Sequence, residues 1–363
     1  MNTKCSFKNI CLIFIMGAFS LISACSSINP LPYDPPEAPP LKDSTAPNKA
    51  LRRVHPLGIG QLGTAEDLAV DNQGRIYGGT ADGRIQRIIF GSDGEEKVET
   101  FAQTDGRPLG LDFDPEGNLI VADAIKGLLA IDPEGTVRVL TTEANGVPFG
   151  FTNDVDVATD GRIYFSDASS VWGTNEYLFD LLEARPHGRM FRYDPNTGQT
   201  ELLLRDLYFA NGIAISQNED FVLVNETYRY RITRYWITGP KSGTSDVFID
   251  NLPGFPDGVS SNGQGTFWLA LFTVRNPIMD WLHPKPWLKS SLSTLPKFLW
   301  PKPEPYGFVL SLDEQGHIVR SLQDPSGEVA KEVTSAEEYD GYLYLGSLHG
   351  DRVWRYALAE QDN

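Results

Sequence analysis

One phrase recurs six times along the chain, and this repetition constrains the fold more than any other feature. Each copy has alternating apolar positions, a turn that usually contains glycine, and then a β-rich run. The copies are EDLAVDNQGRIYGG, LGLDFDPEGNLIVAD, NDVDVATDGRIYFSD, NGIAISQNEDFVLVNE, DGVSSNGQGTFWLAL and VTSAEEYDGYLYLGS. Strict alternation followed by a turn is the pattern of a β-hairpin with one buried face.

A second strand pair follows several of the copies, for example GRMFRYDPNTGQTELLL and YGFVLSLDEQGHIVRSL. Two hairpins in each repeat make a four-stranded antiparallel blade, so six repeats predict an all-β fold, a six-bladed β-propeller over residues 51–363. Five or seven blades are the alternatives, because the first repeat is irregular. The segment 54–60 is expected to supply a strand that closes the ring.

Counting back eight residues from each turn selects one equivalent position at the start of each inner strand. These positions are expected to form a ring around the central channel. They are Glu66, Leu109, Asn153, Asn211, Asp257 and Val333. The two carboxylates and two carboxamides suit a hard cation such as Ca²⁺, or another divalent cation. The plainer interpretation is that these polar side chains line a water-filled channel.

Two repeats carry long insertions, at 168–187 and 274–305, in loops expected to lie on the metal side of the propeller. The second interleaves Trp281, Trp287 and Trp300 with lysines. Three interpretations are open: a lid over an apolar substrate pocket, a contact with a membrane interface, or short helices that bury their aromatic side chains. His349 follows the last repeat at the same end and is a candidate for proton transfer.

The first 25 residues have the pattern of an export signal. Two lysines precede an apolar run at 10–22, which is short for a membrane span. The run ends in Ile-Ser-Ala-Cys, which resembles a bacterial lipobox and predicts a lipidated Cys25. By the same resemblance, Ser26 favours the periplasmic side of the outer membrane in the cell envelope. An ordinary signal peptide cleaved near Ala24 is the alternative.

The remaining composition limits the classes of partner. The Pro-rich segment 26–50 is expected to be an extended linker that acts as a spacer. All three cysteines lie within the first 25 residues, so the folded body has no disulfide framework. The net charge of −17 repels nucleic acid, and no basic tract offsets it. A protein partner is not indicated.

Several segments resemble a known family, among them GRPLGLDFDPEGNLIVADA, NLPGFPDGVS and EEYDGYLYLGSL. They are similar to the strictosidine synthase-like family, which includes adipocyte plasma membrane-associated proteins. More distantly they resemble the gluconolactonase (senescence marker protein) and paraoxonase groups. The resemblance covers about 63–358. It implies a six-bladed propeller with a channel metal, usually calcium, whose ligands match Glu66, Asn153, Asn211 and Asp257.

The resemblance also bears on the reaction. Plant strictosidine synthases use a glutamate in the last blade, but the matching position here falls near Thr334, and Glu337 and Glu338 lie too close to the turn. The hydrolytic branch is therefore favoured, with Ca²⁺-dependent hydrolysis of a small lactone or aryl ester. Asp257 or His349 would be the base. A non-catalytic binding module at the cell envelope and a condensing enzyme are the alternatives.

Overall fold

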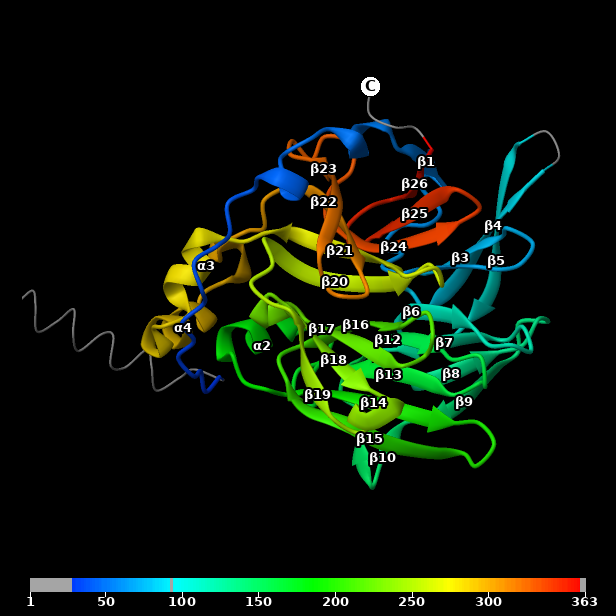
Figure 1. The fold of residues 1–363 in the computed structure, drawn as a ribbon, viewed down its shortest axis with the longest axis horizontal. Coiled ribbons are helices and arrows are strands. Elements are labelled where there is room, and N and C mark those ends of the chain that lie inside the picture. Colours follow the sequence, from blue (N-terminus) through cyan, green and yellow to red (C-terminus); the bar gives the residue numbers. More distant parts are fainter. Residues whose placement is uncertain (1–27, 92–93, 360–363) are drawn as a thin grey trace, which may run out of the picture.

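The computed structural model describes residues 28–91 and 94–359. The predicted export signal, with Cys25, lies outside these residues. Within the described part, six four-stranded antiparallel sheets are arranged as a six-bladed β-propeller (Figure 1). The predicted fold and blade number are therefore confirmed.

The blades follow one another in chain order, each with its strands in the order inner to outer. Blades 1 and 2 comprise β2 (Leu68–Val70), β3 (Ile76–Gly79), β4 (Arg84–Phe90), β5 (Glu96–Gln103), β6 (Pro108–Phe113), β7 (Leu119–Asp123), β8 (Gly127–Ile131) and β9 (Val137–Thr141). Blades 3 and 4 comprise β12 (Thr152–Val157), β13 (Ile163–Asp167), β14 (Gly188–Asp194), β15 (Gln199–Leu207), β16 (Ala210–Ile215), β17 (Phe221–Glu226), β18 (Arg231–Trp236) and β19 (Ser245–Ile249). Blades 5 and 6 comprise β20 (Gly254–Ser261), β21 (Thr266–Val274), β22 (Gly307–Asp313), β23 (Ile318–Asp324), β24 (Val333–Tyr339), β25 (Tyr342–Ser347), β26 (Val353–Ala357) and β1 (His55–Leu57).

The ring is closed by the strand from the N-terminal side. β1 pairs antiparallel with β26, so that His55 lies opposite Arg355 and Leu57 lies opposite Val353. The last blade thus contains strands from both ends of the propeller, as expected from the segment 54–60. Closure of this kind leaves the sheet series without an open end, because the first and last repeats share one sheet.

The hairpin turn of blade 6 is shorter than that of the other blades. In blade 3 the ladder ends where Val157 pairs with Ile163, whereas in blade 6 Tyr339 pairs with Tyr342 across the two-residue turn 340–341. Both residues of that turn have positive φ, 48° and 77°, as a type I′ turn requires. A count of eight residues back from the turn glycine therefore reaches a different strand position in blade 6 from the one it reaches in the other blades.

Carboxylates on the inner strands tie neighbouring blades to one another around the channel. Asp67, just before β2, accepts a hydrogen bond from the N–H of Leu111 in β6 at 2.9 Å. The same type of tie joins Asp112, Asp154 and Asp156 to the N–H groups of Val157, Ile213 and Ile215. Together with Glu337, these carboxyls line a cavity of about 100 Å³ further along the inner strands. The channel interior is therefore acidic beyond the ring position.

Helices and short strands outside the blades lie in the N-terminal segment before β1 and in the loops between strands. They are η1 (Asp43–Thr45), η2 (Ala50–Arg53), β10 (Glu143–Ala144), β11 (Val147–Pro148), α2 (Tyr177–Glu183), η3 (Thr227–Arg229), η4 (Gly239–Lys241), α3 (Pro277–Leu282), α4 (Pro286–Ser293) and η5 (Lys297–Leu299). The insertion at 168–187 contains α2, and the insertion at 274–305 contains α3, α4 and η5. Figure 1 shows α2, α3 and α4 at one end of the molecule. α2 packs on α4.

The Pro-rich segment runs along the body from residue 28 onward. The N–H of Tyr33 donates to the carbonyl of His283, Arg275 donates to the carbonyl of Pro36, and Gln323 donates to the carbonyl of Thr45. The segment is extended over most of its length, but it contacts the blade 5 insertion and β23 instead of pointing away from them. Its position brings the N-terminal end of the described chain to the helical insertions.

Candidate functional site

A pocket of about 410 Å³ lies between the channel and the helical insertions. Its wall is largely apolar and draws side chains from both insertions and from the blade loops. These are Leu109, Phe151, Tyr177, Leu178, Leu181, Leu182, Phe209, Tyr228, Phe255, Phe272, Met279 and Trp300. Both insertions therefore lie on the side of the propeller where the sequence predicted them, and a mostly apolar pocket with a few polar groups is typical of a small-molecule site.

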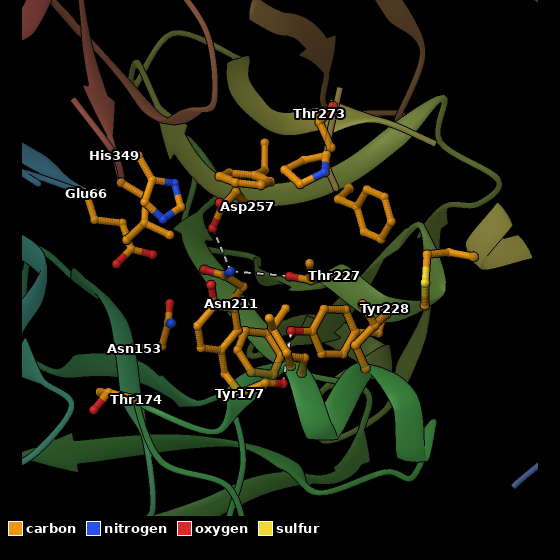
Figure 2. A pocket seen from close by; sticks show the side chains of 18 of the residues that line it. Glu66, Asn153, Thr174, Tyr177, Asn211, Thr227, Tyr228, Asp257, Thr273 and His349 are labelled. Atoms are coloured by element: carbon orange, nitrogen blue, oxygen red, sulfur yellow. Dashed lines mark hydrogen bonds between the residues drawn. The ribbon is translucent and has the colours of Figure 1, made fainter. Parts of the chain in front are cut away.

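Four polar side chains form the floor of the pocket, and all four were selected from the sequence. Glu66 precedes β2, Asn153 lies in β12, Asn211 in β16 and Asp257 in β20. Each comes from a different blade, and Figure 2 shows them around a common space. Asn153, Asn211 and Asp257 are buried. The fold thus brings residues that are far apart in the sequence to one site.

The other two ring positions need one correction. Strand pairing places Leu109 in phase with Asn153 and Asn211, because each lies two residues before the first ladder pair that follows a bulge. By the same criterion the blade 6 residue is Thr334, not Val333, because the turn of blade 6 is shorter. Val333 is fully buried within the blade, whereas the Thr334 hydroxyl donates to the Glu66 carbonyl at 2.6 Å. The ring thus has oxygen-bearing side chains from blades 1, 3, 4 and 5, and Leu109 and Thr334 occupy the two positions on either side of Glu66.

Hydrogen bonds fix the orientation of the Asn211 amide. Its Nδ2 donates to Oδ1 of Asp257 at 2.6 Å and to the hydroxyl of Thr227 at 3.2 Å. The Thr227 hydroxyl donates its own hydrogen to the carbonyl of Pro256 at 2.7 Å, so it must accept from Asn211. With the amide nitrogen committed in this way, the Asn211 carbonyl oxygen is left to accept a ligand.

The carboxyls of the floor are held in an environment that disfavours their charge. Burial, together with the nearby charge of Glu66, holds the pKa of Asp257 well above its usual range. Burial also raises the pKa of Glu66, against the opposing effects of Arg107 and His349. Arg107 approaches Glu66 at 3.8 Å. A bound divalent cation would reverse these shifts, because an adjacent positive charge stabilises both carboxylates.

The donor set of the floor fits a hard cation. It offers two carboxylates and two carboxamide oxygens, the ligand types that Ca²⁺ takes in proteins. Among residues 28–91 and 94–359, no group of three or more His, Cys, Asp or Glu side chains is arranged to hold a metal ion. A site here therefore depends on the mixed set of two acids and two amides.

His349 lines the same pocket and is paired with a residue that the sequence did not indicate. Its Nδ1 lies 3.0 Å from Oε2 of Glu332, a contact that raises the pKa of His349. Glu332 precedes β24 and has the positive φ of 51°. Arg107 was missed as well, and so were Tyr177 and Tyr228. All of them lie in connections between strands, where the repeat has no fixed phase.

The tryptophans of the blade 5 insertion divide between two environments. Trp300 is buried in the pocket wall and its Nε1 donates to the carbonyl of Leu295 at 3.0 Å. Trp281 and Trp287 are both exposed. The insertion is therefore a lid whose inner side is packed.

In the part of the chain that the structure describes, no helix is long and apolar enough to cross a membrane.

The fold and the site define a class, a six-bladed propeller with an oxygen-lined floor beneath a roofed apolar pocket. Family models described as strictosidine synthase and as strictosidine synthase-like, N-terminal, match residues 153–240 and 44–88. The adipocyte plasma membrane-associated protein of Homo sapiens is 38% identical, covering 95% of this chain and 86% of that protein. STRICTOSIDINE SYNTHASE-LIKE 6 of Arabidopsis thaliana is 34% identical, covering 94% and 88%. The chain belongs to the strictosidine synthase-like family.

Solved structures share the fold at lower identity. A gluconolactonase from Xanthomonas campestris has a TM-score of 0.61 at 17% identity, covering 92% of this chain and 99% of that chain. The calcium-binding protein regucalcin from Agrobacterium tumefaciens has a TM-score of 0.56 at 15% identity, covering 81% and 92%. At these identities the similarity establishes the common propeller.

Proposed function

We propose that the protein is a divalent-cation-dependent hydrolase of lactones or aryl esters, with Ca²⁺ as the expected cation. The observation that carries the proposal is the polar floor of two carboxyls and two carboxamides, from four blades, beneath an otherwise apolar pocket. Two propellers of similar fold support it, since one is described as a gluconolactonase and the other as a calcium-binding protein.

Glu66, Asn153, Asn211 and Asp257 would hold the cation, which when bound supplies Lewis-acid polarisation of a carbonyl group. The apolar wall would bind the body of the substrate and exclude bulk water from the floor. Thr227 acts as a positioning residue, because its hydroxyl keeps the Asn211 amide turned with its oxygen toward the floor.

His349 is the stronger of the two predicted bases. Its Nδ1 is engaged with Glu332, so Nε2 can take a proton from the attacking water while Glu332 stabilises the charged ring. The water oxygen bonds to the carbonyl carbon, the ester carbon–oxygen bond breaks, and the proton passes to the leaving alkoxide or phenoxide. Asp257 is the weaker base, because Oδ1 already accepts from Asn211 and a cation would lower its basicity.

The experiment is an assay of aryl acetates and of γ- and δ-lactones with purified protein, first with Ca²⁺ and then with a chelator. We expect activity that the chelator abolishes, that added Ca²⁺ restores, and that Asp257→Ala lacks. Hydrolysis that is indifferent to both the chelator and Asp257→Ala would falsify the proposal. Calcium binding without turnover of any ester would favour the binding-module alternative, in which a cation only ties the blades together.

A condensing activity has less support. The blade 6 ring position holds Thr334, whose hydroxyl is committed to the Glu66 carbonyl. Glu337 lines the deeper acidic cavity, and Glu338 accepts hydrogen bonds from Trp268 and Asn262. Neither acid lines the apolar pocket, so among the described residues that line it there is no glutamate from the last blade to deprotonate an amine.

We also propose that the chain is exported and held in the bacterial cell envelope by a lipid on Cys25, on the periplasmic side of the outer membrane. The lipobox-like ending of the first 25 residues supports this, and the human relative is named as a plasma membrane-associated protein. Metabolic labelling with a radioactive fatty acid tests it: Cys25→Ser is expected to abolish incorporation, and persistent labelling would rule out this anchor.

A further inference from the structure

The blade 5 insertion carries a set of exposed apolar side chains that do not line the pocket. Phe298 on η5 is 73% exposed and Trp281 on α3 is 57% exposed. We call the whole exposed set the lid face; it comprises Ile278, Trp281, Trp287, Leu295, Phe298 and Leu299. Met279, Leu282 and Trp300 of the same insertion already fill its inner cluster. The apolar side chains of the lid face are therefore not needed to pack the lid itself, and exposed apolar patches of this kind mark interaction surfaces.

The charge around the lid face is opposite to that of the protein as a whole. Residues 274–305 contain five basic and two acidic side chains, within a chain of net charge −17. Lys285 Nζ lies 4.1 Å from the ring centroid of Trp281, and Lys297 lies next to Phe298 in η5. Tryptophan and lysine side by side are typical of the headgroup region of a bilayer, and the positive charge favours anionic lipids.

The N-terminal end of the described chain is fixed at the same place. Ile28 packs in the inner cluster of the lid, and the N–H of Asn29 donates to Glu183 on α2 at 2.7 Å. The carbonyl of Leu31 accepts from Lys289 on α4 at 2.6 Å. Cys25 precedes Ile28 by three residues, a span of at most about 10 Å in an extended chain. Any membrane attachment through the first 25 residues therefore begins at the lid.

We propose that the lid face docks on the surface of an anionic phospholipid bilayer and holds the pocket beside that surface. Lys302, Pro303 and His349 line the pocket and are also exposed, so the pocket opens next to the lid. An apolar substrate dissolved in the bilayer would then reach the pocket without crossing bulk water. The docking rests on the lid face and the chain path, and it does not depend on the proposed hydrolase activity.

The test places an environment-sensitive NBD label on the lipidated protein in vesicles of phosphatidylcholine with about one-third phosphatidylglycerol. Residues 26–363 contain no cysteine, so Phe298→Cys provides a single labelling site after signal removal and lipidation of Cys25. Val139→Cys, on the exposed outer strand β9 of blade 2, is the matched control. We expect the label at 298 to shift to the blue, brighten several-fold and resist quenching by aqueous iodide, whereas the label at 139 stays exposed.

Equal quenching of the two labels in vesicles would overturn the proposal, and circular dichroism of both variants confirms that the comparison is made on folded protein. Shielding of position 298 that appears only after a protein extract is added would also overturn it in favour of a protein partner. In a second arm, Lys285→Gln with Lys302→Gln is expected to weaken shielding in vesicles with phosphatidylglycerol. If the same weakening occurs in vesicles of phosphatidylcholine alone, the choice of anionic lipid is wrong.

Discussion

Nδ1 of His349 lies 3.0 Å from a carboxylate oxygen of Glu332, at the rim of a pocket whose floor offers four oxygen ligands. This hydrogen bond is the main cause of the raised pKa of His349, and the negative charge of Glu332 adds to it. A base with a raised pKa is neutral only at higher pH. The pair therefore fixes both the direction of the ring and the pH at which it can accept a proton.

Glu332→Gln should shift the acidic limb of the pH–rate profile to lower pH, because loss of the carboxylate lowers the pKa of His349. His349→Ala should lower kcat by roughly 10²-fold or more, as is typical for loss of a general base. The measurement is kcat/KM between pH 5 and 9 for each variant. His317→Ala is the control, because His317 also pairs with a carboxylate, Asp313, but lies outside the pocket. An unmoved acidic limb in Glu332→Gln would exclude His349 as the group that titrates.

Asp257→Asn should have opposite effects on stability with and without cation. Without cation, the substitution removes a buried carboxyl whose pKa is raised by burial and by Glu66, so the melting temperature at pH 8 should rise. With Ca²⁺, the wild type should gain about 3 kcal/mol at a hundredfold excess over Kd, and the variant should gain much less. Calorimetry with chelator and with Ca²⁺ measures both. Asp180→Asn on α2, also a buried carboxyl, should keep the full response to Ca²⁺.

Trp300→Ala should weaken substrate binding more than turnover, because Trp300 lines the wall of the pocket and not its floor. We expect KM for bulky aryl esters to rise with little change in kcat, and the free energy of unfolding to fall by about 3 kcal/mol. Trp281→Ala is the matched control, since Trp281 belongs to the same insertion but is exposed. Steady-state kinetics on small and bulky esters test the prediction, which is wrong if the two variants behave alike.

The sequence predicted the blades and four floor residues because both depend on periodicity. A hairpin repeat fixes the alternation of side chains, and the inner strands start at one phase, so Asn153 and Asn211 could be aligned without a structure. The same reasoning placed Val333 on the ring by mistake, because the count assumed equal turns. The two-residue turn of blade 6 moves that position to Thr334.

Other features have no signal of this kind. Glu332 and Arg107 lie just outside the strands, where each loop takes its own path. The Pro-rich segment has no periodic apolar face, so its extended form was predictable but its docking on α2 and α4 was not. The division of the tryptophans into an inward Trp300 and outward Trp281 depends on the tertiary packing of α3 and η5, which a short irregular insertion does not specify.

The acidic cavity deeper in the channel leads to a prediction about stability and pH. Burial raises the pKa of Asp156 to about 6 and that of Asp112 well above its usual range. Between about pH 4 and 6 the unfolded chain loses the Asp156 proton while the folded protein keeps it, so stability falls as pH rises through this window. Asp112, with a pKa raised further, extends the fall to higher pH. The ties to backbone N–H groups hold these carboxyls in place despite this cost.

Asp156→Asn should therefore stabilise the protein at pH 8 by on the order of 2 kcal/mol and leave it unchanged near pH 4. The amide oxygen can still accept the hydrogen bond from the Ile215 N–H, so the tie to blade 4 is kept. Chemical denaturation in chelator at pH 4, 6 and 8 measures the difference from the wild type. Glu116→Gln, in an exposed turn, should show no pH-dependent difference. A stability gain for Asp156→Asn that is the same at every pH would mean that proton binding at Asp156 is not its cause.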